Sequence, residues 1–147
     1  MIKKYYSYSE FREDLKSLTK IIDKPFDTIV PIARGGFTIA HFLGEQYNIR
    51  KVYAINSIAY DNTKKLENIK IFNIPNLEES EKVLIIDDII DSGDTLIAIL
   101  EVLNKKYPNI TFYTASIFYK RTAKIKPTWY IKEAHNWIDF FWTVDLN

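Results

Sequence analysis

Two short and largely apolar runs constrain the fold of this chain more than any other feature. Residues 28–32 and residues 83–86 are long enough for buried strands and too short for buried helices. Each run is followed by a polar turn that contains glycine, and then by a segment with apolar residues at helical spacing, at 37–47 and at 96–107. Strands that alternate with helices in this way predict an α/β fold, in which helices cover both faces of a mainly parallel sheet.

The rest of the chain extends the same pattern. Residues 9–22 carry apolar side chains at helical spacing, with Ser9 as the expected N-cap. Residues 51–58 and 110–119 are strand-like. No repeat, low-complexity tract or linker rich in Gly, Ser or Pro divides the sequence, so we expect a single domain over residues 1–147.

Composition and charge argue against several classes of protein. The net charge is only +1 at pH 7, so we expect no nucleic-acid partner. The absence of cysteine excludes disulfides and thiol chemistry. The apolar runs are too short to span a bilayer, and no signal-peptide pattern follows the two N-terminal lysines. We therefore expect a cytoplasmic protein without a membrane span.

A cluster of acidic and small polar residues directly follows the second apolar run. Its members are Asp87, Asp88, Asp91, Ser92, Gly93, Asp94 and Thr95. In α/β sheets, ligands bind just beyond the carboxyl ends of the strands. The start of the following helix offers free backbone N–H groups and a positive dipole end to an anion. Carboxylates accept hydrogen bonds from sugar hydroxyls and are suitable oxygen ligands for Mg²⁺.

This cluster predicts a site for a sugar phosphate. Helix capping would explain one or two of the acids, but not four aspartates within eight positions. Because neighbouring side chains of a strand point in opposite directions, we expect Asp87 and Asp88 to diverge. Asp94 would add negative charge close to the phosphate, and the sequence leaves open whether it turns outward as a helix-start acid.

Residues 83–95 resemble the binding signature for phosphoribosyl pyrophosphate (PRPP) in type I phosphoribosyltransferases. The resemblance implies the fold of that family, with a core of about residues 1–127 and a small C-terminal hood at about 128–147. It also implies that residues 91–95 cradle the 5′-phosphate, with Asp91 near purine N7 as general acid or base.

The same resemblance implies roles for the two preceding acids and for an earlier loop. Asp87 and Asp88 would face the ribose hydroxyls, with Asp88 also at the Mg²⁺. The pyrophosphate-binding loop would be formed by Arg34, Gly35 and Gly36. Glycines let backbone N–H groups converge on an anion and a guanidinium binds phosphate bidentately, although such a turn alone fits an ordinary strand–helix connection equally well.

Three further segments resemble bacterial xanthine-guanine phosphoribosyltransferases. Residues 60–66 resemble the flexible loop that closes over the reacting groups. Lys120 corresponds to a lysine that donates to the purine 6-oxo oxygen, which disfavours adenine because an ammonium cannot accept a hydrogen bond from a 6-amino group. In the hood, Trp137 would stack on the purine and the backbone around Ile138 would meet its C2 edge. Tryptophans near a terminus can also simply close a core.

The resemblance implies a purine salvage enzyme. It would join guanine, xanthine or hypoxanthine to PRPP with Mg²⁺, giving a nucleoside 5′-monophosphate and pyrophosphate, and would form a dimer or tetramer. Three alternatives stay open. They are a transferase for another base, a nucleic-acid-binding regulator that kept the PRPP site, and a nucleotide-binding module without turnover. The charge balance argues against the regulator.

Overall fold

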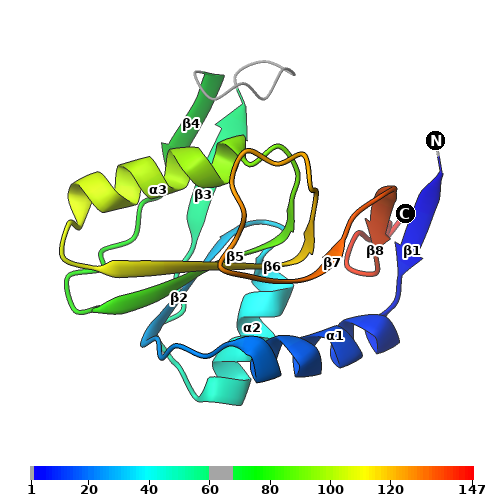
Figure 1. The fold of residues 1–147 in the computed structure, drawn as a ribbon, viewed down its shortest axis with the longest axis horizontal. Coiled ribbons are helices and arrows are strands. Elements are labelled where there is room, and N and C mark those ends of the chain that lie inside the picture. The colour runs from blue at the N-terminus through cyan, green and yellow to red at the C-terminus, as the bar shows by residue number, and fades with distance from the viewer. Residues whose placement is uncertain (1, 60–67) are drawn as a thin grey trace.

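A single six-stranded sheet forms the centre of the computed structural model, which describes residues 2–59 and 68–147 (Figure 1). The strand order is β4-β3-β2-β5-β6-β7, and every neighbouring pair is parallel except β3 and β4. The strands are β2 (Thr28–Ala33), β3 (Ile55–Ala59), β4 (Ile69–Phe72), β5 (Lys82–Ile90), β6 (Thr111–Tyr119) and β7 (Trp129–Glu133). The loop expected at 60–66 lies outside the described residues.

Three helices cover the two faces of this sheet. In Figure 1, α1 (Tyr8–Ile21) and α2 (Phe37–Tyr47) lie on one side and α3 (Asp94–Lys106) lies on the other. Alternate residues of β5 feed the two cores: Leu84 and Ile86 pack with α1 and α2, whereas Val83 and Ile85 pack with α3. The predicted α/β fold, with a mainly parallel sheet between helices, is confirmed. None of the helices within the described residues is long and apolar enough to cross a membrane.

Several predicted element boundaries differ from the observed ones. α1 is capped by Ser7 rather than Ser9, because Ser7 and Glu10 form a reciprocal capping box. The strand expected at 83–86 continues to Ile90, because its pairing with β6 does not stop at the first aspartate. β3 starts only at Ile55, later than predicted.

A second, two-stranded sheet joins the ends of the chain. β1 (Lys3–Tyr6), which was not predicted, pairs in parallel with β8 (Trp137–Phe140). Tyr6 anchors this sheet, because its ring is fully buried and makes edge contacts with Phe11, Phe118, Phe140 and Trp142. Aromatic packing therefore fixes the two terminal strands to the core.

The Tyr6 hydroxyl also has a charged partner. It donates to Asp14 Oδ2 over 2.6 Å, and Lys132 Nζ lies 3.0 Å from the same oxygen. Burial, followed by the bond to Asp14, raises the pKa of Tyr6, so the hydroxyl stays a donor. This contact ties β1 to α1 and to β7.

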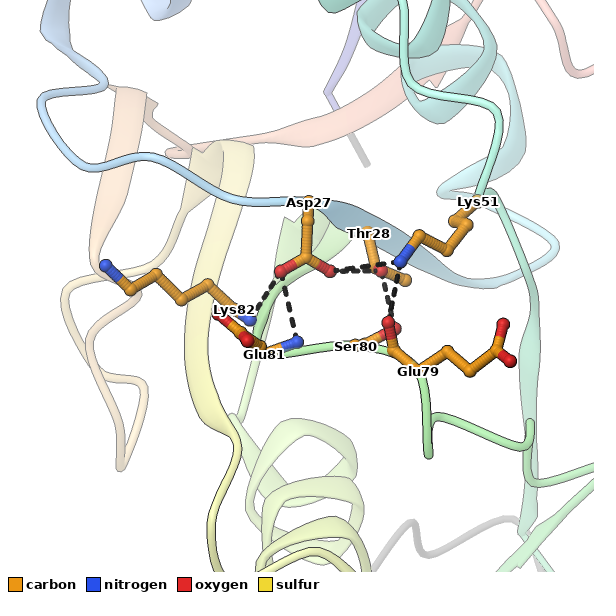
Figure 2. Close-up of polar contacts among 7 residues, drawn as sticks. All are labelled: Asp27, Thr28, Lys51, Glu79, Ser80, Glu81 and Lys82. Carbon is orange, nitrogen blue, oxygen red and sulfur yellow. Dashed lines mark hydrogen bonds and ion pairs between the residues drawn. The ribbon is translucent and has the colours of Figure 1, made fainter.

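A polar cluster joins β2 and β5 at the amino-terminal ends of these strands (Figure 2). One oxygen of Asp27 accepts hydrogen bonds from the backbone N–H groups of Glu81 (3.0 Å) and Lys82 (2.9 Å). Its other oxygen accepts from Thr28 Oγ1 and lies 3.8 Å from Lys51 Nζ. The start of β5 is thus locked to the start of β2.

The pKa of Asp27 reflects these contacts. Partial burial alone would raise the pKa, but the hydrogen bonds from Thr28, Lys82 and Glu81, with Lys51 nearby, outweigh burial and hold the pKa below its ordinary value of 3.8. A depressed carboxyl pKa stabilises the fold fully above the unfolded-state pKa. That stabilisation is lost as the pH falls through the folded-state pKa.

We predict that Asp27→Ala lowers the free energy of unfolding at pH 7 by about 1 kcal/mol, a figure that allows for the partial exposure of the group. The difference from the parent should narrow below about pH 4, where the unfolded chain begins to bind the proton. Urea unfolding between pH 7 and pH 3 measures both effects. Asp145→Asn, at an exposed C-terminal acid, is the control, and an unchanged difference across this range would contradict the assignment.

Candidate active site

A cavity of about 590 Å³ opens at the carboxyl ends of β5 and β6, beside β8. It is lined by the whole acidic cluster, by Lys120 and by the terminal segment. The lining residues outside residues 87–96 are Lys120, Asn136, Trp137, Ile138, Asp139, Phe140 and Thr143. Segments far apart in the sequence therefore meet where a parallel sheet is expected to bind its ligand. A cavity of about 630 Å³ along α2 contains none of the predicted site residues.

Asp87 and Asp88 occupy the end of β5, inside the strand rather than in a turn. The prediction that their carboxyl groups diverge is wrong, because the two groups interact with each other. The Asp87 carboxylate turns back to accept from the Asp88 N–H (2.9 Å), and Asp88 in turn accepts from the Ile89 N–H (2.7 Å). Each carboxylate is thus held by the backbone N–H of the residue that follows it.

Burial raises the pKa of both carboxyl groups, and repulsion from Asp88 raises that of Asp87 further. Two like charges held together in a partly buried site favour a cation between or beside them. Such a pair fits Mg²⁺, which takes one or two carboxylates and completes its shell with water and substrate oxygens. The described residues contain no group of three or more His, Cys, Asp or Glu that could hold a metal, so substrate oxygens would have to contribute.

The Arg-Gly-Gly turn lies directly against this acidic pair. A Cβ atom on Gly35 would come within 2.5 Å of Asp88 Oδ2, so the close approach requires glycine. A Cβ atom on Gly36 would meet the Ile86 carbonyl oxygen at 2.3 Å, which explains the second glycine. The Ala33–Arg34 peptide bond is cis. Arg34 is exposed, and its guanidinium has no ion pair within residues 2–59 and 68–147.

Asp91 and Lys120 form an ion pair across the cavity, with Asp91 Oδ1 2.9 Å from Lys120 Nζ. Their side chains remain 59% and 38% exposed, respectively, and so are accessible to a ligand. The Lys120 backbone N–H donates to the Ile90 carbonyl over 2.9 Å, which fixes the base of the lysine beside the acidic cluster. The structure thus brings together two residues that the sequence places almost thirty positions apart.

The start of α3 has the features of an anion site. Gly93 is the N-cap with a φ of +86°, a conformation that favours glycine, and it makes no side-chain cap. Because glycine has no side chain, the cap residue itself does not compete with a ligand for the first N–H groups of the helix. The Asp94 N–H donates to Ser92 Oγ over 3.2 Å. The sequence left open how the Asp94 side chain turns at the start of the helix. In the structure it is paired with Lys124, whose Nζ lies 2.8 Å from Asp94 Oδ1.

The terminal segment contributes both exposed and buried residues to the lining. Trp137 is 59% exposed, although it lines the cavity, whereas Ile138 is buried. Sequence reasoning missed two contacts here. Trp142 lies near the Asp88 carboxylate and partly offsets the raised pKa of that group. Lys124 pairs with Asp94, and no sequence pattern indicated either contact because the partners are remote in the chain.

The family model and the curated relatives that match this chain are all phosphoribosyltransferases. The model of the phosphoribosyl transferase domain matches residues 3–147. The chain is 22% identical over 148 residues to the xanthine-guanine phosphoribosyltransferase of Idiomarina loihiensis, covering 97% of this chain and 88% of the relative. It is 27% identical over 153 residues to that of Cereibacter sphaeroides, covering 97% and 87%.

Solved structures show the same likeness. The Helicobacter pylori xanthine-guanine-hypoxanthine phosphoribosyltransferase superposes with a TM-score of 0.89 and 42% identity, over 99% of this chain and 96% of that one. A purine phosphoribosyltransferase from Pyrococcus horikoshii superposes with a TM-score of 0.81 and 26% identity, over 97% and 94%. With a family match along nearly its entire length, and with the acidic cluster at the end of β5, this chain belongs to the phosphoribosyltransferase family.

Proposed function

We propose that this purine phosphoribosyltransferase works in purine salvage and transfers the 5-phosphoribosyl group of PRPP to a 6-oxopurine: guanine, xanthine or hypoxanthine. The observation that carries the proposal is the cavity in which the acidic cluster, Lys120 and the terminal segment meet. The names of its relatives support a purine as the acceptor. The catalytic domain is residues 1–147, with a core of about 1–127 and a hood of about 128–147.

In this proposal PRPP lies along the carboxyl end of β5. Residues 91–95 hold the 5′-phosphate through hydroxyls and the N–H groups at the start of α3. Asp87 and Asp88 accept hydrogen bonds from the ribose hydroxyls, and Asp88 also takes Mg²⁺. The pyrophosphate lies on the turn formed by Arg34, Gly35 and Gly36, which the close approach of Gly35 to Asp88 places next to the acids.

The purine occupies the space between Asp91, Lys120 and the exposed Trp137 ring. Purine O6 and N7 are neighbouring atoms on one edge of the base, and Lys120 and Asp91 are a donor and an acceptor at hydrogen-bond separation. The pair therefore matches a 6-oxo oxygen beside a protonated N7. Trp137 stacks on the ring, and the backbone at Ile138 faces the C2 edge.

The reaction is a displacement at ribose C1′. Purine N9 attacks C1′, the bond from C1′ to the pyrophosphate oxygen breaks, and its electron pair leaves with pyrophosphate. Asp91 takes the proton from N7, which keeps the purine neutral as N9 bonds. Arg34 neutralises charge on the departing pyrophosphate. When bound, Mg²⁺ would supply further positive charge to the pyrophosphate.

The proposal also includes a cytoplasmic enzyme that assembles as a homodimer or homotetramer. Large apolar side chains exposed on the described surface, among them Tyr5, Phe37 and Tyr53, offer area for such a contact. Light scattering coupled to size-exclusion chromatography measures the assembly state.

Pyrophosphate release from PRPP and Mg²⁺, with each base added in turn, tests the function. We expect release with guanine, xanthine or hypoxanthine but not with adenine, uracil or orotate, and none after chelation of the metal. PRPP binding without release for any base would reject the transferase and direct attention to nucleic-acid binding.

Asp91→Asn should lower kcat by about 100-fold, because the amide cannot take the purine proton. The KM for PRPP should change far less, since the backbone donors of the loop remain. Steady-state kinetics separate the two, with Asp145→Asn as the control for loss of a carboxylate elsewhere. Parent-like turnover in Asp91→Asn would remove this residue from the catalytic role.

Lys120→Gln should reduce the preference for 6-oxopurines over adenine by about tenfold or more, because an amide both donates and accepts hydrogen bonds. The measurement is kcat/KM for hypoxanthine, guanine and adenine. Arg121→Gln is the matched control. Arg121 is adjacent and cationic, but its guanidinium binds Glu133 of β7 rather than the cavity. If both variants keep the parent's selectivity, Lys120 does not read the base.

A further inference from the structure

Asp94 places a carboxylate where the proposed site needs to bind a phosphate. It is the first residue of α3, so its own backbone N–H belongs to the set that would hold the 5′-phosphate. The side chain is buried, with only 6% of the residue exposed, and it lines the same cavity as Ser92 and Thr95. An acid at a helix start is favourable in itself. At this position, however, it would compete with and repel a phosphate dianion.

The turn after β6 supplies the compensating charge. Lys124 Nζ lies 2.8 Å from Asp94 Oδ1, and 64% of the lysine side chain is exposed. The backbone of the turn is fastened to the acidic cluster as well, since Lys124 N–H donates to the Ser92 carbonyl over 2.8 Å. A Cβ atom on Gly93 would lie 2.9 Å from Ile125 Cγ2. Backbone and side chain of Lys124 are therefore both held against residues 92–94.

We propose that Lys124 is a positioning residue for PRPP: it neutralises and immobilises the Asp94 carboxylate, so that the N–H groups at the start of α3 can donate hydrogen bonds to the 5′-phosphate. This inference rests on the proposed function of the site. Lys124 acts through Asp94 rather than by touching the substrate. The positive charge of Lys124 is thus needed only as long as residue 94 is an acid.

Removing the two charges of the Lys124–Asp94 pair singly and together tests the role of Lys124. Lys124→Met leaves the Asp94 carboxylate uncompensated a few ångströms from the phosphate, and the KM for PRPP should rise by about tenfold or more. Asp94→Asn in the same chain removes the repulsion, so the double variant should return to within about threefold of the parent. Lys124→Arg keeps the charge and should rescue as well. The KM for the base and kcat at saturating PRPP should move little in Lys124→Met and in Lys124→Arg.

The matched control is Lys126→Met. Lys126 lies in the same turn and carries the same charge, but its ammonium lies over the Tyr130 ring, 5.2 Å from the centroid, away from Asp94. This variant should keep the parent's KM for PRPP. Raised salt should also shrink the defect of Lys124→Met, because screening weakens the repulsion.

Equilibrium binding separates this inference from the proposed function. Isothermal titration with guanosine 5′-monophosphate and with guanosine isolates the contribution of the phosphate. In Lys124→Met the nucleotide should lose about tenfold in affinity, whereas the nucleoside should lose little. If the Asp94→Asn double variant fails to restore nucleotide binding, Lys124 contacts the phosphate itself or serves only the fold, and the inference is overturned. A parent enzyme that binds the nucleotide but turns over no purine would refute the proposed function alone.

Discussion

The hydrogen-bonded pairing of β5 with both of its neighbours is the interaction on which the rest of the structure depends. β5 pairs with β2 from Thr28 opposite Val83, and with β6 as far as Ile90 opposite Tyr119. Its apolar residues supply both cores, because helices cover the two faces of the sheet. One end of the strand is locked by Asp27, and the other end carries the paired aspartates. The strand thus connects the stability of the sheet with the placement of the site.

Charge in the site is divided into two unequal halves. Asp91 and Asp94 are each matched by a lysine from the segment after β6, at 2.9 Å and 2.8 Å. Asp87 and Asp88 have no such lysine among the described residues, and burial together with their mutual repulsion raises the pKa of Asp87. The compensated half is suited to an anion and the uncompensated half to a cation or to sugar hydroxyls. A ligand with a phosphate at one end and a metal-bound pyrophosphate at the other satisfies both halves.

The C-terminal segment that lines the cavity is paired with the first strand of the chain. β1 pairs with β8, and the buried Tyr6 ring lies among aromatic residues from α1, β6 and the terminal segment. Trp142 reaches from this segment to the Asp88 carboxylate. Packing of the termini therefore affects the surroundings of Asp88 directly, although no residue of β1 lines the cavity.

Local sequence determined the central strands and the covering helices of this protein. The apolar runs at 28–32 and 83–86 and the helical spacing at 37–47 were sufficient to predict the mainly parallel sheet and its covering helices. The acidic cluster indicated a candidate site after the second run, and a cavity lies there. The prediction of Ser9 as the N-cap of α1 was wrong, although Glu10 follows Ser7 at the spacing of a capping box. These features depend on neighbours in the chain, and for that reason a linear pattern carries them.

Only the tertiary structure decided how remote charges and rings combine. The pairing of Lys124 with Asp94 and the pairing of Lys120 with Asp91 each join residues about thirty positions apart, which no periodicity of the sequence encodes. The parallel pairing of β1 with β8 likewise joins the first residues of the chain to the last. Such contacts arise from the packing of whole elements, so the sequence alone determined which groups were present and the fold determined which of them meet.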